Sequence, residues 1–169
     1  MRAAAAVIDS SPLIGLTHLD LALNLSLFFH PVYVPRSVQR EVNRRSRFRY
    51  RLRKLYQTGL FVPCRAADRI NVDLLRQDLG EGEAEALVQA QEKQARFFIG
   101  DDQRARQLSG NMGLVPVGTA RLLARLHLEG YAEETGVLVR KLRRDLRFRI
   151  ADSVLDEAVA RAGEPLLPY

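Results

Sequence analysis

The sequence has a single cysteine, Cys64, and no tryptophan in its 169 residues. One cysteine excludes an internal disulfide and a cysteine-rich zinc site. The three histidines, His18, His30 and His127, are scattered without the spacing of metal ligands. No apolar run approaches the ~20 residues needed to cross a bilayer, and Asp9 interrupts the short apolar run near the N-terminus. We therefore expect a cytoplasmic protein without a membrane-spanning segment.

Positive charge is in excess and is unevenly distributed. The chain has 26 lysines and arginines against 20 acidic residues, a net charge of +6 and a pI near 10.0. Residues 44–54, RRSRFRYRLRK, contain seven basic residues and no acid, and residues 140–149 contain six basic residues and one acid. Such a surface favours a polyanionic partner, either nucleic acid or an acidic protein segment.

Short apolar segments alternate with helical patterns along the chain. This alternation, with short linkers, predicts a three-layer α/β/α fold with a mainly parallel central sheet. The length suits one domain, with a helical C-terminal extension from about residue 130. The expected strands are 3–8, 31–35, 60–63, 96–99 and 114–117. The expected helices are 12–29, 35–45 (continued or followed by a second helix in the basic stretch), 81–95, 101–108, 119–129, 134–146 and 151–162.

Acidic residues occur where the predicted strands end and the following helices begin. Because ligands of open α/β sheets bind beyond the carboxyl ends of the strands, several carboxylates are expected at one edge of the sheet. The set comprises Asp9 after the first strand, Glu41 on the helix after the second, Glu81, Glu83 and Glu85 before the fourth, and Asp101 and Asp102 after the fourth.

Each acid also has a purely structural interpretation. Asp9 and the Asp101–Asp102 pair can cap helices, and acids in a first turn complement the helix dipole. Glu41 has arginines at positions 40, 44 and 45 and can form a surface ion pair. The functional interpretation depends on the combination. Clustered carboxylates require a cation or protonation, and oxygen ligands suit Mg²⁺ or Mn²⁺. Such a centre beside basic surface is typical of phosphodiester hydrolysis.

Five segments in order resemble the PIN domain, the fold of the VapC-type toxin ribonucleases. They are VIDSSPLIGL at 7–16, VYVPRSVQREV at 32–42, GEGEAEALVQA at 80–90, FFIGDDQRAR at 97–106 and VPVGTARLLARLHLEG at 115–130. The tail at 138–164 resembles a longer subgroup with added C-terminal helices. The resemblance implies a PIN-like nuclease domain over 1–130 and a helical extension over 131–169, packed on the same domain.

The resemblance also implies a quartet of acids that holds Mg²⁺ or Mn²⁺. By position, Asp9, Glu41, Glu83 and Asp102 match the quartet, with Asp101 as the rival of Asp102. Ser11 and Thr119 match polar residues that hydrogen-bond the attacking water or a metal ligand. The third acid is usually aspartate, whereas Glu83 is one methylene longer, and Glu85 is a second candidate at that position. RNA as substrate, a homodimer and a small antitoxin partner are further implications of the resemblance.

The basic stretch at 44–54 has three interpretations. Its basic residues can bind phosphates, with Phe48 and Tyr50 available for stacking. Alternatively, Phe48, Leu52 and Leu55 form the buried face of a helix whose solvated side is basic, or the surface docks an acidic antitoxin segment. The candidate nucleic-acid-binding residues are Arg44, Arg45, Arg47, Arg49, Arg51, Arg53 and Lys54.

Three functions follow from these features. The first is a metal-dependent endoribonuclease, the toxin of a type II toxin–antitoxin pair. The second is a catalytically weak PIN module that binds RNA or a protein partner. The third, a phosphatase or phosphotransferase, ranks last because Asp9 is followed by two serines instead of a DxD pattern, and no Gly-rich phosphate loop is present.

Overall fold

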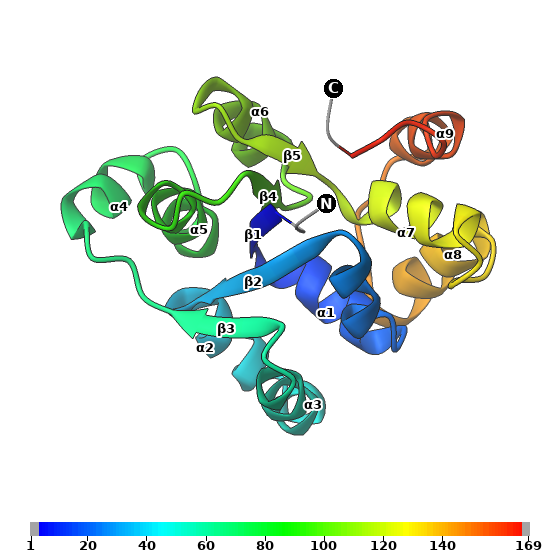
Figure 1. The fold of residues 1–169 in the computed structure, drawn as a ribbon, viewed down its shortest axis with the longest axis horizontal. Helices are drawn as coiled ribbons and strands as arrows, with labels where there is room; N and C mark the ends of the chain where they lie inside the picture. Colours follow the sequence, from blue (N-terminus) through cyan, green and yellow to red (C-terminus); the bar gives the residue numbers. More distant parts are fainter. Residues whose placement is uncertain (1–3, 167–169) are drawn as a thin grey trace.

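A computed structural model of the chain describes residues 4–166. Its five strands form one sheet in the order β3-β2-β1-β4-β5, and every neighbouring pair is parallel. The predicted α/β/α fold with a parallel sheet is therefore confirmed (Figure 1). The strands are β1 (Ala4–Ile8), β2 (Phe29–Pro35), β3 (Phe61–Cys64), β4 (Phe97–Ile99) and β5 (Val115–Val117). Ala3, in the first predicted strand, lies outside the described residues.

Helices follow most strands and cover both faces of the sheet. The N-terminal helices are α1 (Ser10–His18), the 3-10 helix η1 (Ala22–Leu27), α2 (Arg36–Arg44), α3 (Ser46–Gln57), α4 (Arg69–Leu75) and α5 (Glu81–Glu92). They are followed by α6 (Gln103–Asn111), α7 (Thr119–Leu128), α8 (Thr135–Leu146) and α9 (Asp152–Ala160). In the part of the chain that the structure describes, no helix is long and apolar enough to cross a membrane.

The two faces of the sheet have separate hydrophobic cores because successive strand side chains point in opposite directions. Ala6 and Ile8 join the larger core, which includes α1 and α7, whereas Val7 packs with Phe98 beneath α5 and α6. In Figure 1, α4 and α5 lie on one side of the sheet and α1, α7 and α8 on the other. Burial on both faces explains why β1 is apolar throughout.

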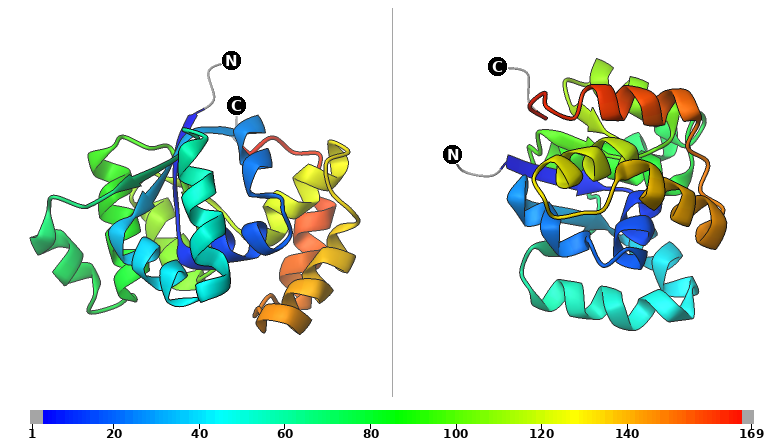
Figure 2. Two further views of the ribbon diagram at one scale, coloured as in Figure 1. Left: turned by 90° about the horizontal axis from the view of Figure 1, so that it is seen from below. Right: turned by 90° about the vertical axis from the view of Figure 1, so that its right-hand side faces the viewer.

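The C-terminal helices pack on the larger core. Leu138, Val139 and Leu142 of α8 belong to the same cluster of buried side chains as Ile8. Phe148 lies against Gly15 of α1, where an added Cβ would be 2.9 Å from its ring. Figure 2 shows α8 and α9 at the opposite end of the molecule from α4. The boundary near residue 130 stays a prediction.

Two details of the helix prediction are wrong. The sequence pattern predicts one helix over 12–29, but α1 ends at His18 because Asp20 adopts a left-handed backbone with φ 59°. The N–H of Leu21 then bonds the Leu16 carbonyl at 2.8 Å, which closes the helix end. The pattern also misses the short helix α4. Asp68 caps this helix by accepting a hydrogen bond from the Asn71 N–H, and its buried residue is Val72.

Candidate metal centre at the carboxyl edge of the sheet

The central strands end level with one another. Ile8 of β1 is in register with Ile99 of β4, which is in register with Val117 of β5. The pairing continues one residue further, because the Asp9 N–H donates to the Ile99 carbonyl at 2.9 Å. The residues that follow these strands, Asp9, Asp101 and Thr119, therefore lie at one edge of the sheet.

Asp9 lies at the centre of this edge and is only 4% exposed. It occupies the N-cap position of α1, yet its side chain makes no capping hydrogen bond. Burial, together with the negative charges of Glu83, Glu41 and Asp101, raises the pKa of Asp9 to about 8. The capping interpretation therefore leaves the burial of this carboxylate unexplained.

Glu41 and Glu83 approach Asp9 from two helices. Glu41 lies on α2 and is exposed, and Glu83 lies in the first turn of α5 and is half-buried. Gly82 lies close to both Asp9 and Glu41. A Cβ added at Gly82 would be 3.1 Å from Asp9 Oδ1 and 3.9 Å from Glu41 Oε2. Gly82 is in the first turn of α5, and the sequence pattern did not single it out.

The two aspartates after β4 have different surroundings. Asp101 is half-buried and accepts hydrogen bonds from the Thr119 N–H at 2.7 Å and from Thr119 Oγ1 at 2.6 Å. Burial raises the pKa of Asp101, while the Thr119 bonds and the charge of Arg106 oppose the rise. Asp102 is exposed and caps α6, accepting from the Ala105 N–H at 2.8 Å. Asp101, and not Asp102, contributes its charge to the surroundings of Asp9.

Glu85 is separate from this group. It is 1% exposed and accepts hydrogen bonds from the Ser37 N–H, at 2.8 Å, and from the Ser37 hydroxyl. Arg69 lies 3.5 Å away as its ionic partner. Glu85 thus anchors the first turn of α2 on α5, which holds in place the helix that bears Glu41.

Replacing Glu85 with alanine should destabilise the protein strongly. The Ser37 N–H and hydroxyl would lose their acceptor in a buried environment, at a cost of about 3 kcal/mol. Glu81 on the same helix is a matched control, because its pairing with Arg40 is exposed and worth at most about 1 kcal/mol. Urea unfolding of both alanine variants measures the difference. Equal stabilities would contradict an anchoring role for Glu85.

The remaining acids and polar residues have simpler positions. Glu81 pairs with Arg40 at 2.8 Å on the surface. Ser11 is exposed in the first turn of α1. Within residues 4–166, no set of three or more His, Cys, Asp or Glu side chains is arranged closely enough to hold an ion. The donor chemistry nevertheless suits Mg²⁺ or Mn²⁺, because the grouped side chains are all carboxylates.

Residues 46–54 of the basic stretch lie in α3, whereas Arg44 ends α2 and Arg45 lies between the two helices. The buried apolar face, one of the three interpretations, is observed, and Phe48 is therefore not available for stacking on a base. Phe48, Leu52 and Leu55 are buried on one side of the helix. Basic side chains lie on the other side, where Lys54 stacks over the exposed ring of Tyr50. Arg51 pairs with Asp20, and Arg49 donates to the Asn43 carbonyl. We call the basic side chains of residues 44–54 the basic strip.

Comparison with protein families agrees with this fold. Neither curated proteins nor solved structures gave a significant match. A family model described as a PIN domain matches residues 5–164, which includes the C-terminal helices α8 and α9. PIN domains are commonly nucleases, and the family match spans the edge that carries Asp9, Glu41, Glu83 and Asp101. The chain therefore belongs to the PIN-domain family.

Proposed function

We propose that the protein is a metal-dependent endoribonuclease whose metal ligands are Asp9, Glu41, Glu83 and Asp101. The observation that supports this most is the position of Asp9. It is a buried carboxylate at a strand end, without a capping hydrogen bond and with three other carboxylates contributing negative charge. Such a group costs folding stability because it must either be protonated or be neutralised by a bound cation.

In this proposal the fourth metal ligand is Asp101, whereas the sequence analysis ranked Asp102 first for that position. Asp102 is engaged as the cap of α6, whereas Asp101 faces the site and is oriented by both donors of Thr119. Thr119 accordingly acts by positioning Asp101. Ser11, exposed two residues after Asp9, can hydrogen-bond a water or the substrate.

A divalent cation would be held by carboxylate oxygens from four different parts of the chain. When bound, Mg²⁺ or Mn²⁺ supplies positive charge for the transition state and lowers the pKa of a water ligand. Gly82 leaves the space in which Asp9 and Glu41 approach each other. The exposed Glu41 side chain is free to move towards Asp9 when the cation neutralises the repulsion between the carboxylates.

The biological role that we propose is that of a type II toxin. The basic surface suits RNA as the polyanionic substrate, and a homodimer and a small antitoxin complete this proposal. A second function is a PIN module that binds RNA or a protein without cutting. It is favoured by the departure at Glu83, whose longer side chain shifts a ligand by about one bond length relative to the aspartate expected there.

We predict that the basic strip contributes to RNA binding. Replacing Arg47, Arg49 and Arg53 with glutamine should weaken single-stranded RNA binding about tenfold at moderate salt. The slope of log Kd against log salt should also fall, by about 0.7 for each phosphate that the variant no longer neutralises. Because Phe48, Leu52 and Leu55 are untouched and the Arg49 bond to the Asn43 carbonyl is exposed, the melting temperature should fall by no more than about 4 °C. An unchanged Kd would leave the strip as the solvated face of α3 or as a protein-docking surface.

The decisive experiment compares RNA cleavage in Mg²⁺, in Mn²⁺ and in EDTA. The substrates are a mixed pool of single-stranded and structured RNA and a DNA pool of matched sequence. Cleavage of RNA that requires the metal supports the proposal. Cleavage that persists in EDTA contradicts metal dependence, and RNA binding without cleavage under every condition favours the binding module.

A further inference from the structure

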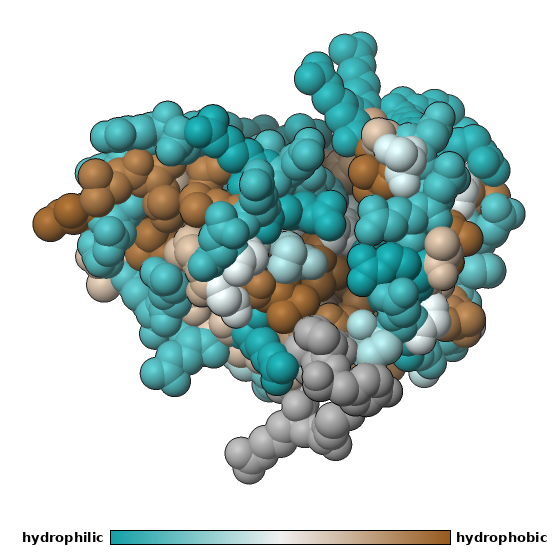
Figure 3. Space-filling model, turned by 90° about the horizontal axis from the view of Figure 1, so that it is seen from above, coloured by the Kyte–Doolittle hydropathy of each residue, from teal (hydrophilic) through white to brown (hydrophobic). Residues whose placement is uncertain are grey.

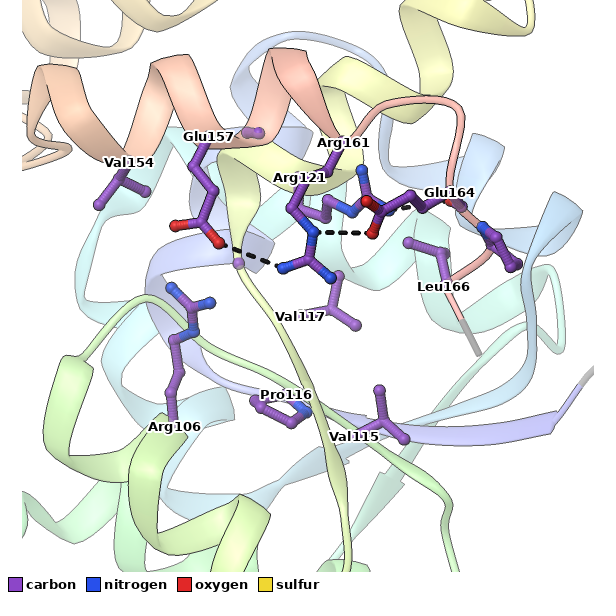
Figure 4. Close-up of a pocket in the computed structure, with 13 residues that line it drawn as sticks. Arg106, Val115, Pro116, Val117, Arg121, Val154, Glu157, Arg161, Glu164 and Leu166 are labelled. Carbon is purple, nitrogen blue, oxygen red and sulfur yellow. Dashed lines mark hydrogen bonds and ion pairs between the residues drawn. The ribbon is translucent and has the colours of Figure 1, made fainter. Parts of the chain in front are cut away.

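A pocket of about 480 Å³ opens beside the edge strand β5, between α6, α7 and α9. Val115, Pro116 and Val117 form an apolar wall, and Arg106, Arg121 and Arg161 bring guanidinium groups from three helices and their ends (Figure 4). Figure 3 looks onto this side of the molecule and shows apolar residues at the base of a hollow between polar side chains. An apolar wall with a few convergent charged groups is typical of a ligand pocket.

Two of the three arginines have donors without partners. Within residues 4–166, the buried atoms Arg106 Nε and Arg121 Nη1 lack a hydrogen-bond acceptor. Buried guanidinium donors without acceptors are costly in a folded protein. Burial and the charge of Arg161 lower the pKa of Arg121, and the charges of Glu164 and Glu157 only partly oppose this. An oxyanion in the pocket would supply negative charge to both arginines, and it would bond these two solvent-inaccessible nitrogens once the guanidinium groups turn towards it.

The carboxylates in the pocket are already engaged. Glu157 lies 3.1 Å from Arg161 Nη1, and Glu164 lies 2.7 Å from Arg161 Nε. The Arg121 Nη2 donates to the Glu164 backbone carbonyl at 2.8 Å. Arg161 therefore neutralises part of the acidic charge, and Arg106 and the remaining donors of Arg121 are left for a ligand.

The pocket lies next to the acidic edge. Gly118 separates the two: an added Cβ there would be 3.3 Å from Asp101 Oδ1 and 3.4 Å from Arg106 Nη1. Arg106 thus lies within one residue's width of a proposed metal ligand. Successive phosphates of a nucleic acid strand are close enough together for one to lie at the acids while a neighbour enters the pocket.

We infer that the pocket between β5, α6, α7 and α9 binds a backbone phosphate of the RNA strand adjacent to the phosphate that is cut, through Arg106 and Arg121. The identity of the ligand as RNA rests on the proposed function. The apolar wall offers a surface for the attached sugar or base, and the guanidinium donors receive the phosphate oxygens. Arg106 and Arg121 then position the strand relative to Asp101.

The test measures binding in the Asp9→Asn background, in which the RNA stays intact. A short single-stranded RNA carries one neutral methylphosphonate linkage, moved along the strand one position at a time. At one position the neutral linkage should weaken binding about tenfold, the loss expected for hydrogen bonds to a charged group. In Arg106→Gln the same linkage should change Kd less than about twofold, because the partner is already missing.

Arg104→Gln is the matched control, since it removes the same charge from the same helix. Arg104 is exposed, pairs with Asp78 and lies outside the pocket lining. The linkage effect should persist in this variant. Arg106→Lys keeps the charge without the guanidinium geometry, so the effect of the neutral linkage on Kd should be intermediate. This variant provides a second test if Arg106→Gln folds poorly.

The outcomes separate this inference from the proposed function. A linkage effect that depends on Arg106 supports the inference, even if the parent protein does not cut RNA. If the effect of the neutral linkage is the same with and without the Arg106 side chain at every position of the strand, the inference is overturned, even if the parent protein cuts RNA. Uridine monophosphate is titrated in parallel. If Arg106→Gln weakens only its binding and the scan shows no dependence, the pocket receives a free phosphorylated molecule and the assignment to RNA is overturned.

Discussion

Replacing Asp9 with asparagine should abolish RNA cleavage and, at the same time, stabilise the metal-free protein. The amide has nearly the same shape but cannot provide the negative charge that holds a cation. Loss of metal catalysis worth several kcal/mol lowers the rate by at least about 10³-fold. Burial and the charges of Glu83, Glu41 and Asp101 disfavour an ionised Asp9, so the neutral residue relieves this repulsion.

The stability gain should be about 1 kcal/mol, which raises the melting temperature by roughly 2–4 °C for a domain of this size. Cleavage assays in Mg²⁺ and thermal unfolding in EDTA measure the two effects on the same preparation. A structural cap would behave differently, because asparagine is as good an N-cap as aspartate and neither quantity would change much. Lost cleavage with a lowered melting temperature would indicate misfolding instead of a missing ligand.

The pair Asp101→Asn and Asp102→Asn should have very different activities. Asp101→Asn removes a charge beside Asp9 while Thr119 can still donate to the remaining amide oxygen, and cleavage should fall by about 10³-fold. Asp102→Asn keeps a good cap on α6 and should retain activity within about threefold.

Each of these two variants is the control of the other, since they are adjacent, isosteric and equal in charge change. Initial cleavage rates at saturating Mg²⁺ provide the comparison, and circular dichroism checks that both proteins are folded. A greater loss in Asp102→Asn would return the fourth ligand position to Asp102. Equal losses would indicate an effect of net charge on RNA binding, which higher salt would reveal.

Periodicity and strand-end acids were enough to predict the architecture. Apolar runs such as 3–8 are too short for helices and are apolar on both faces, which is the pattern of strands buried in a parallel sheet. The order of acids after the strands also predicted that Asp9 and the Asp101–Asp102 pair lie at one edge of the sheet. Helical spacing offered the buried face of α3 as one of three interpretations, and the burial of Phe48, Leu52 and Leu55 bears it out. Helix ends were less predictable, because the turn at Asp20 depends on a left-handed backbone that aspartate adopts only in a suitable context.

Only the tertiary structure separated acids that are equivalent in sequence. Glu83 and Glu85 lie two residues apart on α5, so they point to different sides: Glu83 towards Asp9, and Glu85 towards Ser37 and Arg69. Asp101 and Asp102 differ in the same way, one held by Thr119 and the other by its own helix. The pocket of Arg106 and Arg121 depends on the packing of α9 on α7, beside β5, a long-range arrangement that no local pattern encodes. Residue type and spacing therefore indicated the chemistry of the candidate site, whereas side-chain direction and long-range packing decided which acids lie together at the sheet edge.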